Sequence, residues 1–403
     1  MKIVILTQYF PPEVGAPQNR LYELGVRLAA KGDEVTVLTA MPNYPEMKIH
    51  DKYKRKLYCC ENKDGLRILR SWIFVSKSKS ILFRLVNYYS FVISSFIFGA
   101  FKLKETDYLI CESPPLFLGK TGWLLSLITR SKFVFNVSDL WPESAEKLGL
   151  VTNKKVLWIS AKLEEFLYRK SFLITGQTQG IVKNIKQRFP DKRIYWLPNG
   201  VDISLFKAGK NSAWKLKKGF SEDDFIFLYA GIIGHAQGLE VILKCAKMTL
   251  DNPTIKYLLL GSGPEKDKLM KLKVDLNLTN VYFEEPVTKT EMKDVLASVD
   301  ATIIPLRKLE LFLGAIPSKI FENLAMKVPV ILGVDGEAKE LFVDKGKCAL
   351  YFEPENADDL YKCVVKMITD KVSANAISEN GFIYVSENFN RDRIAENFRN
   401  QLK

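Results

Sequence analysis

The sequence contains few of the residues on which hydrolytic and metal-dependent catalysis usually depends. It has two histidines, His50 and His235, and no Gly-x-Ser-x-Gly motif. Histidine, cysteine and aspartate do not cluster at the spacing of metal ligands. These absences argue against a Ser-His-Asp or Cys-His site, and no metal is expected.

Nucleotide-binding fingerprints and disulfide signals are missing as well. Neither G-x-G-x-x-G nor G-x-x-x-x-G-K-[ST] follows a predicted strand, which excludes the dinucleotide-binding and P-loop classes. The six cysteines form no C-x-x-C pair and are expected to be free thiols in a reducing compartment. The N-terminal KIVILTQYF has the pattern of a first β-strand and not that of a signal peptide.

Positive charge is concentrated in the first half of the chain. The 403 residues carry a formal charge of +13. Residues 1–199 hold 31 Lys and Arg against 17 Asp and Glu, whereas residues 200–403 hold 28 against 29. A one-sided basic half favours an anionic partner, such as a membrane surface, a phosphorylated substrate or nucleic acid. A basic surface without a partner is the alternative.

What the sequence does contain is a repeated α/β pattern. A buried-type strand, a loop, a helix with apolar residues at helical spacing and a second strand follow one another over residues 2–40. This order is typical of a parallel sheet with crossover helices. A second cycle starts after residue 220. Later strands are expected at 107–113, 132–139, 172–178, 193–200, 225–231, 256–264, 280–287, 301–306 and 328–334.

The length and the two cycles predict two domains. The N-terminal domain is expected over 1–202 and the C-terminal domain over 203–387, beginning with a Lys-rich linker at 203–224. A C-terminal helix over 388–403 is expected to pack back on the N-terminal domain.

Residues 85–101, LVNYYSFVISSFIFGAF, are uncharged. Basic residues flank them, namely Lys77, Lys79 and Arg84 before and Lys102 and Lys104 after. Seventeen residues are at the lower limit for a membrane span. A buried crossover helix is the second interpretation. The positive charge of this half favours the third, a helix over 81–104 that lies in the membrane interface.

Three glycine-containing loops follow predicted strands, at 14–18, 231–238 and 261–264. Such loops let backbone N–H groups approach a phosphate, although glycine often serves only the turn. In doubly wound sheets, ligands bind beyond the carboxyl ends of the strands. Together the loops predict a phosphate-bearing ligand in a cleft between the domains.

The stretch GAIPSKIFENLAMKVPV at 314–330 supplies a cation and an acid. Pro-Ser-Lys is expected to open a helix, so that the Lys319 ammonium and free N–H groups face one spot suited to a diphosphate. Glu322 lies one turn further, where a carboxylate can accept hydrogen bonds from two vicinal hydroxyls, as on a ribose. The alternative for Glu322 is an acid favoured by the helix dipole.

Six stretches in a fixed order carry a family resemblance. They are QYFPPEVGAPQNRLYELGVRLAAKGDEVTVLT (8–39), VSDLWPES (137–144), LPNGVDISLF (197–206), YAGIIGHAQGLEVIL (229–243), LLLGSGPEKDKL (258–269) and PSKIFENLAMKVPVI (317–331). With them the chain resembles the retaining, nucleotide-sugar-dependent enzymes of glycosyltransferase family 4, especially the branch that builds O-antigen and capsule repeat units. The resemblance implies the GT-B fold, with two facing Rossmann-like, doubly wound domains and an interdomain cleft. It also implies that the N-terminal domain binds the acceptor and the C-terminal domain binds the nucleotide sugar.

The resemblance also implies a set of donor-binding residues. Glu322 would bind the ribose hydroxyls, and Ser318 and Lys319 would hold the sugar and the diphosphate. Gly15, in the loop after the first strand, would lie over the diphosphate. The other implied contacts are Gly234, Gln237 and Gly238 in the second glycine loop and Gly261 in the third, facing the phosphates, and backbone near Val287 for uracil or another base.

Two positions depart from the family pattern. Gly314 stands eight residues before Glu322, where the family usually has a glutamate that contacts the donor sugar, and Glu310 lies four residues earlier still. His235 and Gln237 stand near the second glycine loop, where the family often has an arginine and a lysine. The donor's sugar contacts are therefore open, and Lys319 is expected to carry more of the phosphate charge. A deoxy or N-acetylated deoxy sugar would suit Gly314.

The implied function is transfer of a sugar, with retention, from a donor that is expected to be UDP-linked. The acceptor is a lipid-diphosphate-linked glycan, and the enzyme is expected to be cytoplasmic and peripheral on the inner face of an anionic membrane. The leaving phosphate oxygen can take the acceptor proton, so neither a histidine base nor a metal or prosthetic group is required. Asp139 is the candidate for orienting the acceptor hydroxyl or donor sugar, alongside Lys319 and Glu322, unless it is a helix N-cap.

Two rival functions remain. A nucleotide-sugar epimerase or hydrolase of the same architecture would need an acid–base pair near the sugar, for which His235 is available. A nucleic-acid-binding protein would use the basic half. Against it, no helix-turn-helix or zinc motif occurs and the basic residues are not interleaved with aromatics.

Overall fold

A computed structural model describes residues 1–13, 15–44, 46–78, 80–147, 149 and 151–403. Val14, in the first predicted glycine loop, and Lys79, a predicted flanking cation, lie outside the described residues. The chain divides into two units. Unit 1 comprises Met1–Asn199 and Arg391–Lys403, and unit 2 comprises Gly200–Asn390. These bounds lie three residues from the predicted ones.

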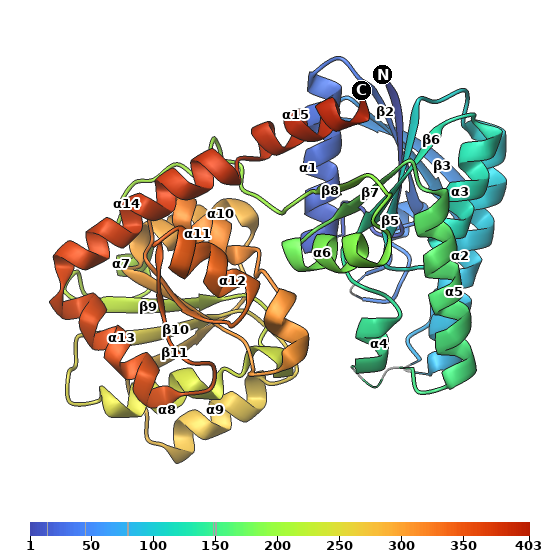
Figure 1. The fold of residues 1–403 in the computed structure, drawn as a ribbon. Helices are drawn as coiled ribbons and strands as arrows, with labels where there is room; N and C mark the ends of the chain where they lie inside the picture. The colour runs from blue at the N-terminus through green and yellow to red at the C-terminus, as the bar shows by residue number, and fades with distance from the viewer. Residues whose placement is uncertain (14, 45, 79, 148, 150) are drawn as a thin grey trace. The chain divides into compact units, whose positions relative to one another are not determined.

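Unit 1 contains an eight-stranded sheet in the order β3-β4-β2-β1-β5-β6-β7-β8 (Figure 1). The strands are β1 (Lys2–Leu6), β2 (Glu34–Ala40), β3 (Tyr58–Lys63), β4 (Leu66–Ser71), β5 (Tyr108–Ser113), β6 (Lys132–Val137), β7 (Leu173–Gly176) and β8 (Ile194–Trp196). Every neighbouring pair is parallel except β3 and β4, which are antiparallel. The parallel strands are apolar runs because helices cover both faces of the sheet.

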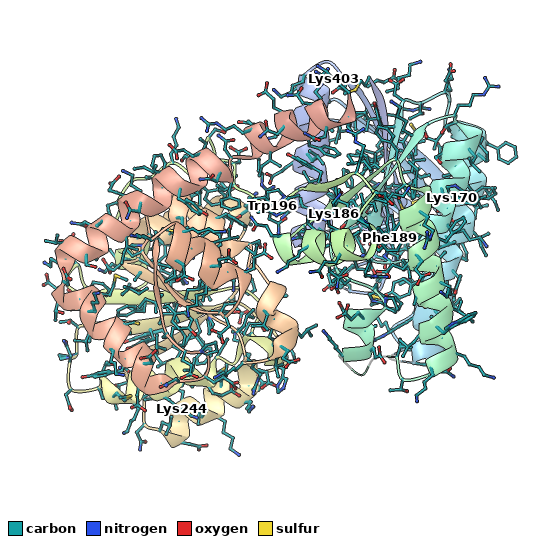
Figure 2. The ribbon with its side chains drawn as sticks, viewed as in Figure 1. Lys170, Lys186, Phe189, Trp196, Lys244 and Lys403 are labelled. Carbon is teal, nitrogen blue, oxygen red and sulfur yellow. The ribbon has the colours of Figure 1, made fainter. Side chains whose placement is uncertain are left out.

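Helices cover the two faces of this sheet with separate apolar clusters. One cluster unites α2 (Ile81–Lys102), α3 (Leu118–Ile128), α5 (Lys154–Lys170) and α6 (Gln179–Arg188) with the strands, and includes Phe189 (Figure 2). The other unites α1 (Ala16–Ala30) and α15 (Arg391–Leu402). The short helix α4 (Glu143–Lys147) follows β6. The last helix packs beside α1 (Figure 1), with Phe398 fully buried and Arg399 paired to Asp33 at 2.6 Å.

Unit 2 contains a six-stranded parallel sheet in the order β11-β10-β9-β12-β13-β14. The strands are β9 (Phe225–Ala230), β10 (Ile255–Leu260), β11 (Val281–Glu284), β12 (Ala301–Pro305), β13 (Val330–Gly333) and β14 (Ala349–Tyr351). The helices are α7 (Ala213–Lys217), α8 (Glu240–Met248), α9 (Lys266–Asp275), α10 (Lys289–Ser298), α11 (Lys319–Ala325), α12 (Glu337–Lys339), α13 (Ala357–Thr369) and α14 (Lys371–Asn388). This order brings the turns after β9, β10, β12 and β13 to one edge of the sheet.

The predicted linker at 203–224 is wrong in its second half. Residues 213–217 form α7, which contacts α10. Lys215 is buried, and its ammonium donates to the carbonyl oxygens of Glu222, at 3.1 Å, and Asp224. The segment resembles a linker because it is rich in lysine, but Lys215 is a buried residue that stabilises the turn at 222–224 in unit 2.

Three strands lack a counterpart in the sequence prediction. Polar residues make up much of the segments YCCENK and LRILRS, which form β3 and β4. The two strands pair antiparallel at the edge of the sheet. Arg70 is buried in this pair and bonds Glu61 at 2.6 Å. The side chains of β3 are half-buried or exposed, so its sequence has the polar pattern of a surface segment. The third, β14, is only three residues long.

The uncharged stretch forms most of α2. Its inner face is buried, with Phe91 and Ser95 fully covered, as a crossover helix requires. Its outer face exposes Ile93 at 58%, Ile97 at 47% and Phe101 at 82%. Among the described residues, α2 and the other helices are too short or too polar to cross a bilayer. The inner face therefore packs as in a crossover helix, and contact of the outer face with a membrane interface remains a prediction.

Candidate donor site in unit 2

The predicted cation Lys319 begins α11 and reaches back to the end of β9. Its Nζ lies 4.0 Å from the centroid of the Tyr229 ring. A Cβ placed on Gly231 would lie 2.7 Å from the same Nζ, so the glycine leaves the space that the ammonium occupies. The Tyr229 hydroxyl donates to the carbonyl oxygen of Ile232 at 2.5 Å and so fixes the ring. A ring face and a glycine therefore hold the cation at a strand end.

The surroundings of Lys319 disfavour its charged form and lower its pKa. Burial lowers its pKa from 10.5 to about 7, and the carboxylate of Glu322 partly offsets the effect by favouring the ammonium. A cation removed from water in this way gains strongly from an anionic ligand, because the field between the charges is poorly screened. The site is thus suited to a diphosphate.

Glu322 and Ser318 lie on either side of Lys319 in the chain. Glu322 is half-buried on the first turn of α11, and Ser318 is exposed directly before the helix. The Ser318 side chain makes no capping hydrogen bond. The predicted grouping of these residues at one end of α11 is therefore present, and their contacts to a donor remain predictions.

The third glycine loop is built for close packing against the second. A Cβ on Gly261 would lie 1.8 Å from the carbonyl oxygen of Gly231, and one on Gly263 would lie 2.3 Å from that of Ile233. Both glycines have positive φ, 152° and 155°. Any side chain at these two positions would collide with the backbone of the second loop, so packing alone requires glycine there. The phosphate contact of Gly261 remains a separate prediction.

Arg307, which follows β12, fastens the loop at 234–238. Its Nε donates to the carbonyl oxygen of His235 at 2.7 Å, and its guanidinium lies 3.3 Å from Glu240. Gly238 has φ 57° and would meet the Arg307 side chain at 3.1 Å if it carried a Cβ. Gly234 precedes the 3-10 turn His235–Gln237. The predicted phosphate loop is therefore held in one conformation by a cation of unit 2.

Gly314 ends the 3-10 turn Glu310–Gly314 and is exposed. A Cβ there would meet no atom within 4 Å. Packing therefore does not require glycine at this position. Glu310 is exposed and lines a cavity of about 350 Å³, together with Arg307 and Asp335 among others. The predicted base contact, Val287, is half-buried between β11 and α10.

Two predicted residues belong to unit 1. Gly15 precedes α1 in an extended conformation, and a Cβ there would lie 2.3 Å from Oε1 of Gln18. Asp139 follows β6, and its carboxylate accepts a hydrogen bond from the Ser144 hydroxyl of α4. Burial raises the pKa of Asp139. Asp139 thus has a local partner, and its role toward an acceptor or donor remains a prediction.

Tyr229 and Arg307 are the residues that sequence reasoning missed. Tyr229 is the last residue but one of β9, and Arg307 lies two residues after β12. Each is therefore close to the carboxyl end of a strand, which is the signal available in the sequence. Nothing in the letters indicates that the Tyr229 ring meets a lysine ninety residues later.

Comparisons with known proteins agree with this architecture. A family model described as "Glycosyl transferases group 1" matches residues 210–383. WcaI of Escherichia coli strain K12, named as a colanic acid biosynthesis glycosyl transferase, is 26% identical over 373 residues, covering 89% of this chain and 90% of its own. Sucrose-phosphate synthase from Thermosynechococcus elongatus superimposes with a TM-score of 0.77 at 17% identity, covering 99% and 97% of the two chains.

A further solved structure is similar over its whole length. HepE from Anabaena, in complex with UDP and glucose, gives a TM-score of 0.73 at 17% identity and covers 100% of this chain and 99% of its own. The two α/β sheets, one parallel and one mixed, and these neighbours define a protein of the GT-B fold. The family match over residues 210–383 and the WcaI relative support a glycosyltransferase enzyme.

Proposed function

We propose that the chain transfers a sugar, with retention of configuration, from a UDP-sugar to a lipid-diphosphate-linked glycan in cell-surface polysaccharide synthesis. The Lys319 ammonium, held between Tyr229 and Gly231, is the observation that carries the donor assignment. A colanic acid transferase among the relatives supports the polysaccharide role, and the UDP complex of a structural neighbour supports the base.

The chemistry asked of this chain is positioning and charge stabilisation. Lys319 would neutralise the diphosphate as the glycosidic bond to it breaks. Glu322 would hold the ribose, and Asp139 would orient the acceptor hydroxyl or the sugar. The departing phosphate oxygen takes the acceptor proton, so none of these residues needs to act as a strong base.

The absence of a side chain at Gly314 indicates which donor sugar fits the site. Because neither packing nor space requires glycine there, the missing side chain is more simply explained by the ligand. A donor without the hydroxyl that a glutamate would hold, such as a deoxy or N-acetylated deoxy sugar, fits this position.

A thermal-shift screen tests the donor assignment. UDP and UDP-sugars should raise the melting temperature, since a ligand that binds only the folded state stabilises it by mass action. GDP and GDP-sugars should have a smaller effect. A GDP preference would overturn the assignment of the base, and sugar release without any acceptor would favour the hydrolase. Equal turnover of UDP-glucose and UDP-linked deoxy sugars would count against the interpretation of Gly314.

Unit 1 is proposed to lie on an anionic membrane, where the acceptor is anchored. Two helices that both pack on α3 expose apolar side chains, Val86, Tyr89, Ile93, Ile97 and Phe101 on α2 and Val156, Trp158 and Ile159 on α5. Exposed lysines accompany them, Lys102, Lys154, Lys155 and Lys170. Apolar side chains with flanking cations are the features of an interfacial surface.

Vesicle binding tests this proposal. Phe101→Glu combined with Trp158→Glu should reduce the fraction bound to phosphatidylglycerol vesicles at least about tenfold, because two exposed rings that would enter the lipid are lost and negative charge is added. Val372→Glu in unit 2 is the matched control, since Val372 and Phe101 are both 82% exposed. Unchanged sedimentation of the double variant with vesicles would show that these helices do not contact lipid.

A further inference from the structure

Unit 1 contains a cavity that the donor chemistry does not use. It has a volume of about 340 Å³ and lies among the loops that follow β1 and β2. Its walls include Pro12 and Glu13 from the first loop and Asn43, Tyr44, Lys48 and His50 from the second. The carboxyl ends of parallel strands are where open α/β sheets bind their ligands.

A buried carboxylate joins the two loops. Glu13 is 5% exposed and accepts three backbone N–H groups, from Phe10 at 3.1 Å, Asn43 at 2.8 Å and Tyr44 at 2.9 Å. Burying a carboxylate is costly unless it is hydrogen-bonded, and burial raises the pKa of Glu13. The bond from Phe10 closes the first loop on itself, and the bonds from Asn43 and Tyr44 hold the first loop against the second.

A buried cation, Arg70, bonds the first loop and the end of β2. Arg70, on β4, is 2% exposed and donates from Nη2 to the carbonyl oxygen of Pro11 at 2.6 Å. It also reaches the carbonyl oxygen of Ala40 at 3.4 Å. The second loop closes on itself, with the N–H of His50 bonded to the carbonyl oxygen of Pro42 at 3.0 Å. The cavity is therefore formed in advance of any ligand, which lowers the entropic cost of binding.

The rim of the cavity has the chemistry of a carbohydrate site. The Tyr44 ring is 45% exposed and packs edge-on against Tyr9, with centroids 5.8 Å apart. Asn43, which also lines the cavity, is buried and donates from Nδ2 to the carbonyl oxygen of Met41 at 3.0 Å. An exposed ring offers a flat apolar surface to the C–H face of a pyranose, and amide and carboxylate groups bond hydroxyls.

The charges around the rim do not favour an anion. Glu46 and Asp51 line the cavity as well as Lys48 and His50, and all four are exposed. Asp51 is already paired with Lys54. A diphosphate or a lipid phosphate would meet as many acids as bases here, so the phosphate chemistry belongs elsewhere.

We propose that this cavity binds a neutral pyranose residue of the acceptor glycan and so determines which glycan is extended. The proposal rests on the proposed transferase function. The cavity volume lies within the range of small-molecule sites, at its lower end, which suits one sugar ring. Tyr44 supplies the stacking surface, while Glu13 and Arg70 act as positioning residues.

Ligand-observed NMR on the full chain tests the proposal. The probes are methyl glycosides of glucose, galactose, N-acetylglucosamine, N-acetylgalactosamine and rhamnose, with methyl glucuronide as the anionic comparison. At least one neutral glycoside should receive saturation from the protein. Tyr44→Ala should weaken that signal at least about fivefold, the scale of one lost aromatic contact. Tyr44→Phe should retain the signal because it keeps the ring, and so should Trp72→Ala, which removes a ring of similar exposure, 41%.

The outcomes separate this proposal from the donor assignment. A UDP thermal shift with no response to any neutral glycoside, or with an equal response in Tyr44→Ala, overturns the cavity's role and leaves the donor site standing. Preference for the glucuronide overturns the assignment of a neutral sugar. Glycoside binding that is lost in Tyr44→Ala supports the cavity, even if UDP gives no shift and the transferase function fails. Unchanged melting temperatures would show that the variants remain folded.

Discussion

Replacing Lys319 with methionine should lower kcat/KM for the nucleotide-sugar donor about 10³-fold, the scale on which single preorganised electrostatic contacts to a transition state act. Methionine fills much of the same space beside the Tyr229 ring, so packing is kept while the charge is lost. Lys327→Met is the control, since Lys327 lies just after the same helix, at the surface, and pairs with Glu379 at 2.7 Å. Steady-state kinetics with a UDP-sugar measure the effect. Donor kinetics of the wild type in Lys319→Met would exclude a role in diphosphate binding.

The pH dependence gives a second signature of Lys319. Its pKa is about 7 in the free protein, so the ammonium that binds the diphosphate is lost as the pH rises through 7. The logarithm of kcat/KM for the donor should therefore fall with a slope near −1 above that pH, until other groups titrate. The Lys319→Met variant should lack this limb.

Stability should change in the opposite direction to activity. Because the pKa of Lys319 is lower in the folded chain than its ordinary value of 10.5, the unfolded chain binds more protons between pH 7 and 10.5. Stability from this group therefore rises with pH over that window, and the full penalty of the buried charge is present below pH 7. Lys319→Met should melt higher than the wild type at pH 6. The buried ammonium of Lys319 lowers the stability of the folded chain, and binding of an anionic ligand explains why a lysine occupies this position.

Glu322→Gln should raise KM for the donor about 10²-fold, because hydrogen bonds from hydroxyls to a carboxylate are among the stronger ones. A sharper test compares UDP with 2′-deoxy-UDP and 3′-deoxy-UDP. The wild type should bind UDP about tenfold or more tightly, whereas Glu322→Gln should discriminate little. Such a cycle isolates the ribose contact from any structural effect. Equal discrimination by both proteins would exclude the ribose role.

The same substitution should change the titration of Lys319. The Glu322 carboxylate favours the ammonium, so removing its charge should move the kinetic midpoint below pH 7. Glu379→Gln, at the surface of the same unit, is the control and should leave the midpoint in place. A midpoint that moves in the control as well would trace the shift to the net charge of the unit.

Much of the fold was predictable because its signals are local. Apolar runs such as KIVIL and FIFLYA mark parallel strands covered on both faces, and their order along the chain predicts two α/β units. The spacing of Lys319 and Glu322 by one helical turn is also local, and α11 places both near its start. The strands β3 and β4 escaped prediction because β3 is a half-exposed edge strand of polar residues and because Arg67 and Arg70 interrupt the apolar run of β4.

Local patterns along the chain therefore predict the two α/β units, most of their strands and the cation and acid at the start of α11. The folded structure was needed to establish that Tyr229 and Gly231 lie against the Lys319 ammonium, and that burial brings its pKa to about 7. It also decided that Glu13 and Arg70 build a cavity between the loops after β1 and β2. The physical reason is the same in each case. Periodicity records which face of one element is apolar, whereas the environment of a charge depends on atoms that other elements bring to it.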